Sequence, residues 1–516
     1  MAVDLSLCCP PSSIPIVLPI HTNGMMTKRN DTESGGKCES TDSEDLQRWP
    51  TPVEIVKEMK ELGSLAGPIA VLGILLYLKA MVSMLFLGKL GDLELAGGSL
   101  SIGFANITGY SVLAGLAMGM EPICGQAFGA KRWKLMGLTL QRTILVLFCA
   151  CLPISILWLN MRKILMLCGQ NGDILSVAHT FLVYSLPDLI AQAILNPMRI
   201  YLRSQQITTP LTYCAALALA LHVPINLLLV DCLGLHVRGV ALSTAWTDFN
   251  VVLFLLAYLW YSGRYKKTWE GWSLDSFREW RPLLQLAIPS CVSVCLEWWW
   301  YEFMIILSGL LVDAQATVAS MGILIQTTAL VYIFPSSLSL AVSTRVGNEL
   351  GANRPAKART AMLVALACAG VVAIMACTFT TSMRHIWGSM FTKDAKILSL
   401  VAMVLPIVGL WFWLDFGFVG LWFGLLAAQV TCVTLMLSVL FNTDWNKQAQ
   451  RAKDLTAPHS DAKVVPSLDE SDAEENATES FVIRSTEEAE AEKDEDEERE
   501  ALISVKVVQP HTADDT

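Results

Sequence analysis

Long apolar stretches, separated by short polar connections, occupy most of the chain between residues 62 and 441. Each stretch holds about 20 residues or more, the length that a helix needs to cross roughly 30 Å of hydrocarbon. The pattern therefore predicts an all-α polytopic membrane protein with about six spans in its first half and about five in its second half. The predicted spans are Leu62 to Gly88, Leu95 to Cys124, Leu135 to Leu159, Ile174 to Leu195, Pro210 to Val230, Val240 to Tyr261, Leu283 to Leu311, Thr317 to Val342, Ala361 to Thr381, Ile397 to Leu414 and Phe418 to Phe441.

Polar segments divide the chain into two predicted helical lobes with flanking tails. Residues 1–52 are a polar leader that we expect to be disordered, and residues 443–516 are an acidic tail of the same kind. Between them lie a six-helix first lobe at residues 53–263, a basic loop at residues 264–282, and an incomplete second lobe at residues 283–442.

Composition supports this class and excludes others. Of the 516 residues, 53% are hydrophobic and 16% are charged, and the mean hydropathy of +0.48 is too high for a water-soluble surface. Much of the net charge of -10 lies in the tail, and no soluble segment is basic and aromatic enough to bind nucleic acid. The 14 cysteines lack the paired spacing of a metal site, and no nucleophile and base stand together. The sequence therefore predicts neither a cofactor nor an enzyme.

The short loops differ in positive charge, which sets the expected orientation in the membrane. Loops on one side carry about twice as many cations as loops on the other side, so the positive-inside rule places this side and the N-terminus in the cytoplasm. The cations on this side are Lys131, Arg132, Lys134, Arg199, Arg203, Arg264, Lys266, Lys267, Arg278, Arg281, Arg354, Lys357 and Arg359.

An internal repeat relates the two halves, as in transporters built from two equivalent helical bundles. Ser64 to Pro68 aligns with Gln285 to Pro289 at an offset of about 221, and Gly125 to Ala130 aligns with Gly347 to Ala352 at about 222. We interpret the glycine-rich stretch at Gly125 as a turn into a loop. Towards the end of the second half the offset falls to about 181, which predicts that roughly 40 residues, and with them one helix, are missing.

The segment Cys295-Leu-Glu-Trp-Trp-Trp-Tyr-Glu302 holds two carboxylates inside a predicted span. An ionisable group at the membrane centre costs on the order of 2.5–3.5 kcal/mol on insertion scales, so each one needs an explanation. Glu297 and Glu302 lie about 140° apart around a helix and can flank one cavity-facing sector. Such carboxyls suit the binding of a proton or cation, and Trp298 could offer its π face to an organic cation. Alternatively, Glu302 faces water near a helix end and the tryptophans anchor a membrane interface.

Four more polar residues within predicted spans are candidates for a binding site. Asp188 is the first-half candidate, although a helix kinked at Pro187 and closed by a hydrogen bond would explain it as well. Lys79 either pairs with a carboxylate or extends to the membrane interface, and we favour the interface. Asn226 and Gln326 could line a cavity, but hydrogen bonds between helices explain them equally well.

The repeated motifs resemble a known family. Glu121-Pro-Ile-Cys-Gly-Gln-Ala-Phe-Gly-Ala130 and Arg345-Val-Gly-Asn-Glu-Leu-Gly-Ala352, together with Cys295 to Glu302, look like those of plant multidrug and toxic compound extrusion (MATE) transporters. The resemblance covers about residues 52–442. It implies two six-helix lobes that export organic cations, alkaloids, flavonoids or organic acids in exchange for protons or sodium. By position, Glu297 and Glu302 match the acidic pair of the family's seventh helix, which serves coupling and cation binding. Gln326 stands where some relatives carry another acid.

The chain departs from the family pattern after Leu405-Pro-Ile-Val-Gly409, where relatives continue with an acidic residue and a complete eleventh helix. The resemblance implies a proton-coupled antiporter of organic cations, xenobiotics or plant metabolites, with small solutes, protons and the lipid bilayer as partners. The departure suggests an alternative, a truncated isoform that does not transport and acts through partners or is cleared by them. In the tail, Glu498-Arg-Glu-Ala-Leu-Ile503 resembles a dileucine signal for cytosolic sorting adaptors, and the vacuolar, endosomal, Golgi and plasma membranes all stay open.

Overall fold

Helices long enough to cross a membrane make up most of the computed structural model. It describes residues 49–167, 172–309, 314–390, 394–409, 433–434, 436–440 and 442–456. Within these ranges eight helices are long and apolar enough to be spans, and a pair bent by 47° makes up to nine. The predicted all-α polytopic fold is thus confirmed. The leader before residue 49, residues 410–432 around the predicted deletion and at the start of the predicted last span, and the tail after residue 456 with its sorting motif lie outside the described residues. The first part of the tail that was expected to be disordered is helical from Trp445 to Thr456.

The first half supplies all six predicted spans, and the fourth is the bent pair α8 and α9. The first helix starts early because Thr51 and Glu54 form a capping box, in which Glu54 accepts a hydrogen bond from the Thr51 amide at 2.7 Å. The elements are α2 (Pro52–Leu90), α3 (Asp92–Ala105), the π-helical turn η2 (Asn106–Tyr110), α4 (Ser111–Met118), α5 (Glu121–Gly129), α6 (Trp133–Leu159), α7 (Met161–Leu167), α8 (Gly172–Tyr184), α9 (Leu186–Ser204), α10 (Thr209–Asn226), the π-helical turn η3 (Leu227–Cys232) and α11 (Val237–Ser262).

The second half contains three long spans and one shorter apolar helix in its described part. Two short 3₁₀ turns precede it in the basic loop. The elements are η4 (Arg264–Lys267), η5 (Leu274–Phe277), α12 (Trp280–Gly309), α13 (Ala314–Gly351), α14 (Pro355–Met383), η6 (Gly388–Met390), α15 (Ala395–Gly409) and α17 (Trp445–Thr456).

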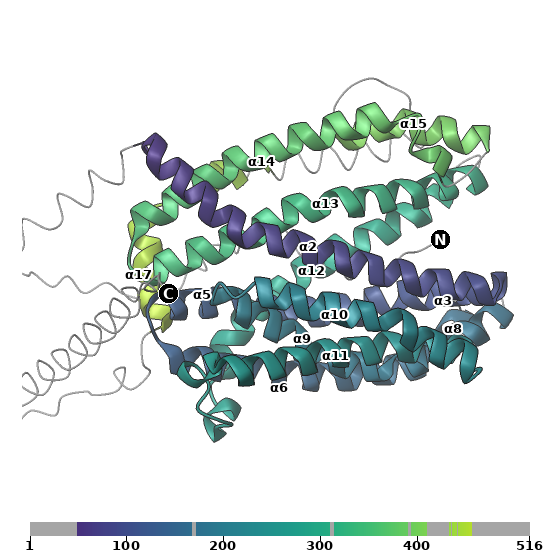
Figure 1. Cartoon of the computed structure of the whole chain (residues 1–516), viewed down its shortest axis with the longest axis horizontal. Helices are drawn as coiled ribbons and strands as arrows, with labels where there is room; N and C mark the ends of the chain where they lie inside the picture. The colour runs from purple at the N-terminus through teal and green to yellow at the C-terminus, as the bar shows by residue number, and fades with distance from the viewer. Residues whose placement is uncertain are drawn as a thin grey trace, which may run out of the picture. The chain divides into compact units, whose positions relative to one another are not determined.

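Helices of the two halves pack directly against each other. Figure 1 shows α2 running beside α13, and a methyl group at Gly73 of α2 would lie 2.9 Å from Ile333 of α13. The helix α12 packs on α4, where Cys295 lies 3.6 Å from the hydroxyl of Ser111. The turn η2 contributes to the same contact, because its Ile107 carbonyl accepts a hydrogen bond from the indole of Trp299 at 2.9 Å. Such π-helical turns expose carbonyl groups that a regular helix would bond internally.

At the cation-rich end, which comprises the α5–α6 and α13–α14 turns, the repeated glycine motifs cross each other. The Cα of Gly347 lies 3.5 Å from where a Cβ of Gly125 would be. A Cβ at Gly129 would lie 1.9 Å from the Asn348 carbonyl oxygen, and one at Gly351 would lie 2.1 Å from the Gln126 carbonyl oxygen. The interpretation of Gly125 to Ala130 as a turn is therefore wrong, because α5 stays helical through Gly129 and its glycines let two backbones touch.

Ion pairs and a short helix surround this crossing. Arg345 binds Glu58 of α2 through two nearly parallel hydrogen bonds of 2.9 and 3.0 Å, and it also lies 3.2 Å from Glu349. The helix α17 packs against both α5 and α13, and Arg132 donates to the carbonyl of Thr456 at its end. Both halves of the chain are thus joined at the cation-rich end by backbone contact, charge pairing and α17.

The basic loop between the halves is fastened to α6. Gln141 uses both ends of its amide, donating to the Gly271 carbonyl at 2.6 Å and accepting from the Ser273 amide at 3.1 Å. Arg142 reaches the Asp275 carbonyl and the Glu279 carboxylate, each at 3.3 Å. The loop residues 268–279 therefore belong to the first half in space, although they precede α12 in the chain.

We expect Gln141→Ala to release this loop, because it removes two partly buried hydrogen bonds worth about 0.5–1.5 kcal/mol each. Trypsin should then cut the purified protein at Arg264, Lys266 and Lys267 roughly tenfold faster, as local opening becomes more frequent. Glu270→Ala is the matched control, since its pair with Lys134 is 3.6 Å long and exposed on both sides. Equal cleavage rates for the two variants would contradict the role given to Gln141.

Candidate functional site

A buried ion pair lies in the first half, where α2, α9 and α11 meet. Lys79 of α2 donates to both carboxylate oxygens of Asp248 of α11, at 2.8 and 2.9 Å. The two side chains are only 4% and 1% exposed. Gln192 of α9 donates to the same carboxylate at 2.7 Å. Lys79 therefore does not extend to the membrane interface, as favoured from the sequence, but pairs with a carboxylate inside the bundle.

Asp188 lies beside this pair, at the start of α9. It is 2% exposed, and Tyr110 of the η2 turn donates to its Oδ2 at 2.7 Å. Its Oδ1 has no hydrogen-bond donor among the described residues, and the carboxylate of Asp248 is close enough to interact with it electrostatically. Two carboxylates that face each other repel, and a single proton between them replaces the repulsion by a hydrogen bond. We call Lys79, Tyr110, Asp188, Gln192 and Asp248 the first-half cluster.

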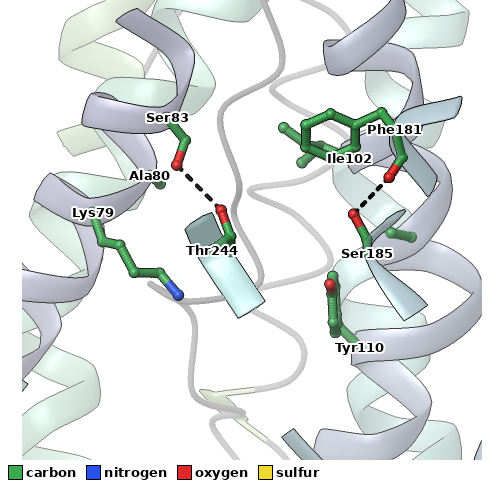
Figure 2. Close-up of a pocket in the computed structure, with 9 residues that line it drawn as sticks. Lys79, Ala80, Ser83, Ile102, Tyr110, Phe181, Ser185 and Thr244 are labelled. Atoms are coloured by element: carbon green, nitrogen blue, oxygen red, sulfur yellow. Dashed lines mark hydrogen bonds between the residues drawn. The ribbon is translucent and has the colours of Figure 1, made fainter. Parts of the chain in front are cut away.

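A small cavity opens onto the first-half cluster (Figure 2). Figure 2 shows Lys79 and Ser83 on one wall and Tyr110 and Ser185 on the other. The cavity measures about 20 Å³, which is enough for about one water molecule. Its hydroxyl groups are oriented by their own helices, as Ser185 donates to the Phe181 carbonyl at 2.9 Å. The cavity can therefore hold a water or an ion next to the charged pair, but not an organic solute.

Asn226 belongs to a second polar layer next to the first-half cluster. Its side chain accepts from Ser243 of α11 at 2.7 Å and donates to the His222 carbonyl at 2.9 Å. The His222 ring joins the same layer, with its Nδ1 2.7 Å from the Thr247 hydroxyl and its Nε2 3.1 Å from the Ser83 hydroxyl. The Asn226 amide thus helps to join α10 to α11.

The two glutamates of α12 face different surroundings. Tyr332 of α13 donates to Glu297 Oε1 at 3.0 Å, which links Glu297 to a neighbouring helix of the second half. Glu302 lies against α3 of the first half, where a methyl group at Gly103 would be 3.6 Å from its Oε1. Both side chains are half-buried. The structure thus places the acidic pair with one member directed to each half.

Trp298 of α12, which follows Glu297 in the chain, and Gln326 of α13 are both buried. Trp298 is 7% exposed and Gln326 is 6% exposed. Within the described ranges, the Trp298 indole nitrogen has no acceptor and the Gln326 amide oxygen has no donor. Buried polar atoms without partners are rare in native proteins and often mark a place where water, an ion or a ligand binds.

The predicted residues therefore fall into two sites. Asp188 lies in the first-half cluster and Asn226 in the layer beside it, whereas Glu297, Glu302, Trp298 and Gln326 lie on α12 and α13. Sequence reasoning missed Asp248, although it stands inside the predicted span Val240 to Tyr261. The high cost of a carboxylate in a span is the signal that could have found it.

A bundle of at least eight spans that buries carboxylates in both halves is the architecture of a multi-pass membrane transporter. The MatE family model matches residues 68–228 and 289–442, one segment in each half. These segments begin at Pro68 and Pro289, the two prolines that the internal repeat aligns.

Similar proteins agree with this match. Protein DETOXIFICATION 48 of Arabidopsis thaliana is 52% identical over 480 residues, covering 85% of this chain and 90% of that protein. Protein DETOXIFICATION 49 of the same plant is 51% identical over 479 residues, covering 83% and 95%. The crystal structure of the eukaryotic MATE transporter AtDTX14 matches with a TM-score of 0.74 at 28% identity, covering 78% of this chain and 100% of that one. The chain belongs to the MatE family, and it is a secondary transporter rather than an enzyme.

Proposed function

We propose that this transporter is a proton-coupled antiporter that exports organic cations, xenobiotics or plant metabolites. The observation that carries the proposal is the division of the acidic pair between the two halves. Glu297 is bound by Tyr332 inside the second half, and Glu302 packs against Gly103 of the first half. A movement of one half against the other would change the surroundings of Glu302 at Gly103. Proton binding and the conformation of the two halves are thereby linked.

Glu297 takes the role of the coupling carboxylate in this proposal. When ionised, it attracts an organic cation, whose positive charge is further favoured by the faces of neighbouring tryptophans such as Trp298. A proton arriving on Glu297 removes the charge that holds the cation, so the substrate leaves. Because the proton and the cation compete for one carboxylate, Glu297 binds one of them at a time. The transporter therefore carries the cation in one direction and the proton in the other.

The direction of transport follows from the predicted orientation. The cation-rich end and the N-terminus face the cytoplasm in this proposal, in accord with the positive-inside rule. The glycine crossing between α5 and α13 lies at that end. The crossing brings the halves together on the cytoplasmic side, so this conformation is the one that releases substrate away from the cytoplasm.

The test uses the full chain in sealed inside-out vesicles, with an acidic interior and ethidium as the organic cation. We expect proton-driven ethidium uptake by the native protein and a loss of at least about tenfold in Glu297→Gln, because the amide can neither bind the cation by charge nor take up a proton. Glu270→Gln makes the same chemical change in the exposed loop and should transport normally.

Two outcomes would contradict the proposal. Uptake by Glu297→Gln at the native rate would exclude Glu297 as the coupling group. Absence of uptake by the native chain, combined with its co-purification with an intact relative, would favour the truncated, non-transporting isoform instead.

A further inference from the structure

We infer that Lys79 is a tethered cation that occupies the cation position of the first-half cluster and thereby makes this cluster unable to bind sodium. Its ammonium group lies 2.8 and 2.9 Å from the two oxygens of Asp248, so it contacts both oxygens as a bound cation would. Lys79 is thus a specificity-determining residue for the coupling ion. The inference deepens the proposed function, since it explains why a proton and not sodium would be used in the first half.

The groups around Asp248 would suit a small hard cation if Lys79 were absent. Sodium prefers oxygen ligands, and two carboxylates and a cavity that holds about one water lie at this position. Gln192 directs its NH2 group at the same carboxylate, so its amide would have to turn over to offer its oxygen to an ion. Asp188 Oδ1 is buried and has no donor from the described part of the chain. The first-half cluster therefore contains the oxygen atoms of a cation site, with a lysine nitrogen in place of the ion.

Lys79 competes with dissolved sodium at an advantage, because its ammonium is already held in the site by the α2 backbone. A tethered group acts at a high effective concentration and loses little further freedom on binding. The surrounding charge also opposes a second cation, because Arg199 of α9 interacts with both Asp188 and Asp248. With Lys79 and Arg199 present, the two carboxylates are already balanced, and a proton between them is the smallest cation that the first-half cluster can add.

A second lysine of α2 supplies an internal comparison. Lys89 binds Asp231 at the same distance of 2.8 Å, but these side chains are 60% and 37% exposed. Water can replace the lysine there without leaving a buried carboxylate, so removal of Lys89 creates no cation site. The comparison separates the effect of a buried tethered cation from the effect of losing any lysine of this helix.

The test compares the thermal unfolding of the purified full chain in equimolar NaCl and choline chloride, followed by its intrinsic tryptophan fluorescence. We expect the native protein to give the same Tm in both salts. Lys79→Ala should have a lower Tm in choline chloride and gain at least about 2 °C in NaCl, because sodium enters the vacated position. Lys79→Arg, which keeps a cation, and Lys89→Ala, which changes the exposed pair, should show no difference between the salts.

A sodium-specific rise of Tm in the native protein would overturn the inference, and so would a folded Lys79→Ala variant that shows none. If the alanine variant does not fold, Lys79→Gln takes its place, because glutamine keeps a hydrogen-bond donor to Asp248. Lys79→Gln should show a smaller sodium-specific rise of Tm, and the absence of this rise would also contradict the inference. The assay measures binding and not transport. If sodium does not raise the Tm of Lys79→Ala while the native protein shows proton-driven uptake, only this inference fails. If sodium raises the Tm of Lys79→Ala while the native protein shows no proton-driven uptake, only the proposed function fails.

Discussion

Replacing Lys79 by methionine is expected to lower the free energy of unfolding by about 3–5 kcal/mol in sodium-free buffer, because the Asp248 carboxylate stays buried without its partner. The Asp248 side chain is 1% exposed and cannot turn to water in the folded state. Asp248→Asn should cost about as much, since it leaves the Lys79 ammonium buried and unpaired. Chemical denaturation in detergent, followed by tryptophan fluorescence, measures both values.

The double variant Lys79→Met with Asp248→Asn distinguishes pairing from packing. Removing both charges leaves no isolated ion, so the double variant should be more stable than either single variant. Lys89→Met is the control for a pair at the same distance of 2.8 Å but exposed to water, and it should cost no more than about 1 kcal/mol. Costs that simply add in the double variant would show that the pair is not energetically coupled.

A methyl group at Gly129 is expected to destabilise the protein by about 1–3 kcal/mol, the usual cost of overpacking a close contact. The added Cβ would lie 1.9 Å from the Asn348 carbonyl oxygen, which belongs to a helix backbone and cannot rotate away. Gly351→Ala meets the Gln126 carbonyl oxygen in the same manner from the other helix and should behave alike. Thermal unfolding of the two variants tests the pairing of α5 with α13.

Gly67→Ala provides a control of opposite sign. This glycine lies in α2 with nothing within 4 Å of an added Cβ, so alanine should stabilise the helix by roughly 0.5–1 kcal/mol.

Cysteine labelling is a second measurement, which shows where the structure of Gly129→Ala opens. Cys124 of α5 is buried at the crossing, and in Gly129→Ala it should react faster with a membrane-permeant maleimide. Unchanged reactivity with unchanged Tm would show that the two helices do not depend on this contact.

The spans of this protein could be predicted because each one buries apolar side chains over a length fixed by the bilayer. The six spans of the first half and the first three of the second half lie where hydropathy places them. Asp188 could be selected for the same physical reason, since a carboxylate inside a span is costly.

The partners of charged side chains could not be predicted, because they come from other helices. The fate of Lys79 depends on Asp248, which is far away in the sequence and whose position relative to α2 is set by packing. Similarly, a Gly-x-x-x-Gly spacing is compatible with a turn or with a helix crossing, and only the approach of α13 decides in favour of a crossing at Gly129. The sequence shows which charged residues and glycines are present, but it does not show which residue of another helix each of them contacts.

The attachment of the basic loop to α6 shortens the link between the two halves. Although 17 residues (263–279) separate α11 from α12 in the sequence, the loop is held to Gln141 and Arg142 as far as Glu279. Glu279 has a positive φ of 57° and directly precedes α12, which starts at Trp280. The halves are thus connected by a hinge of about one residue and not by a long flexible linker. A rigid-body rotation of the second half would concentrate its backbone change at Glu279, and longer insertions there would decouple the halves without touching either site.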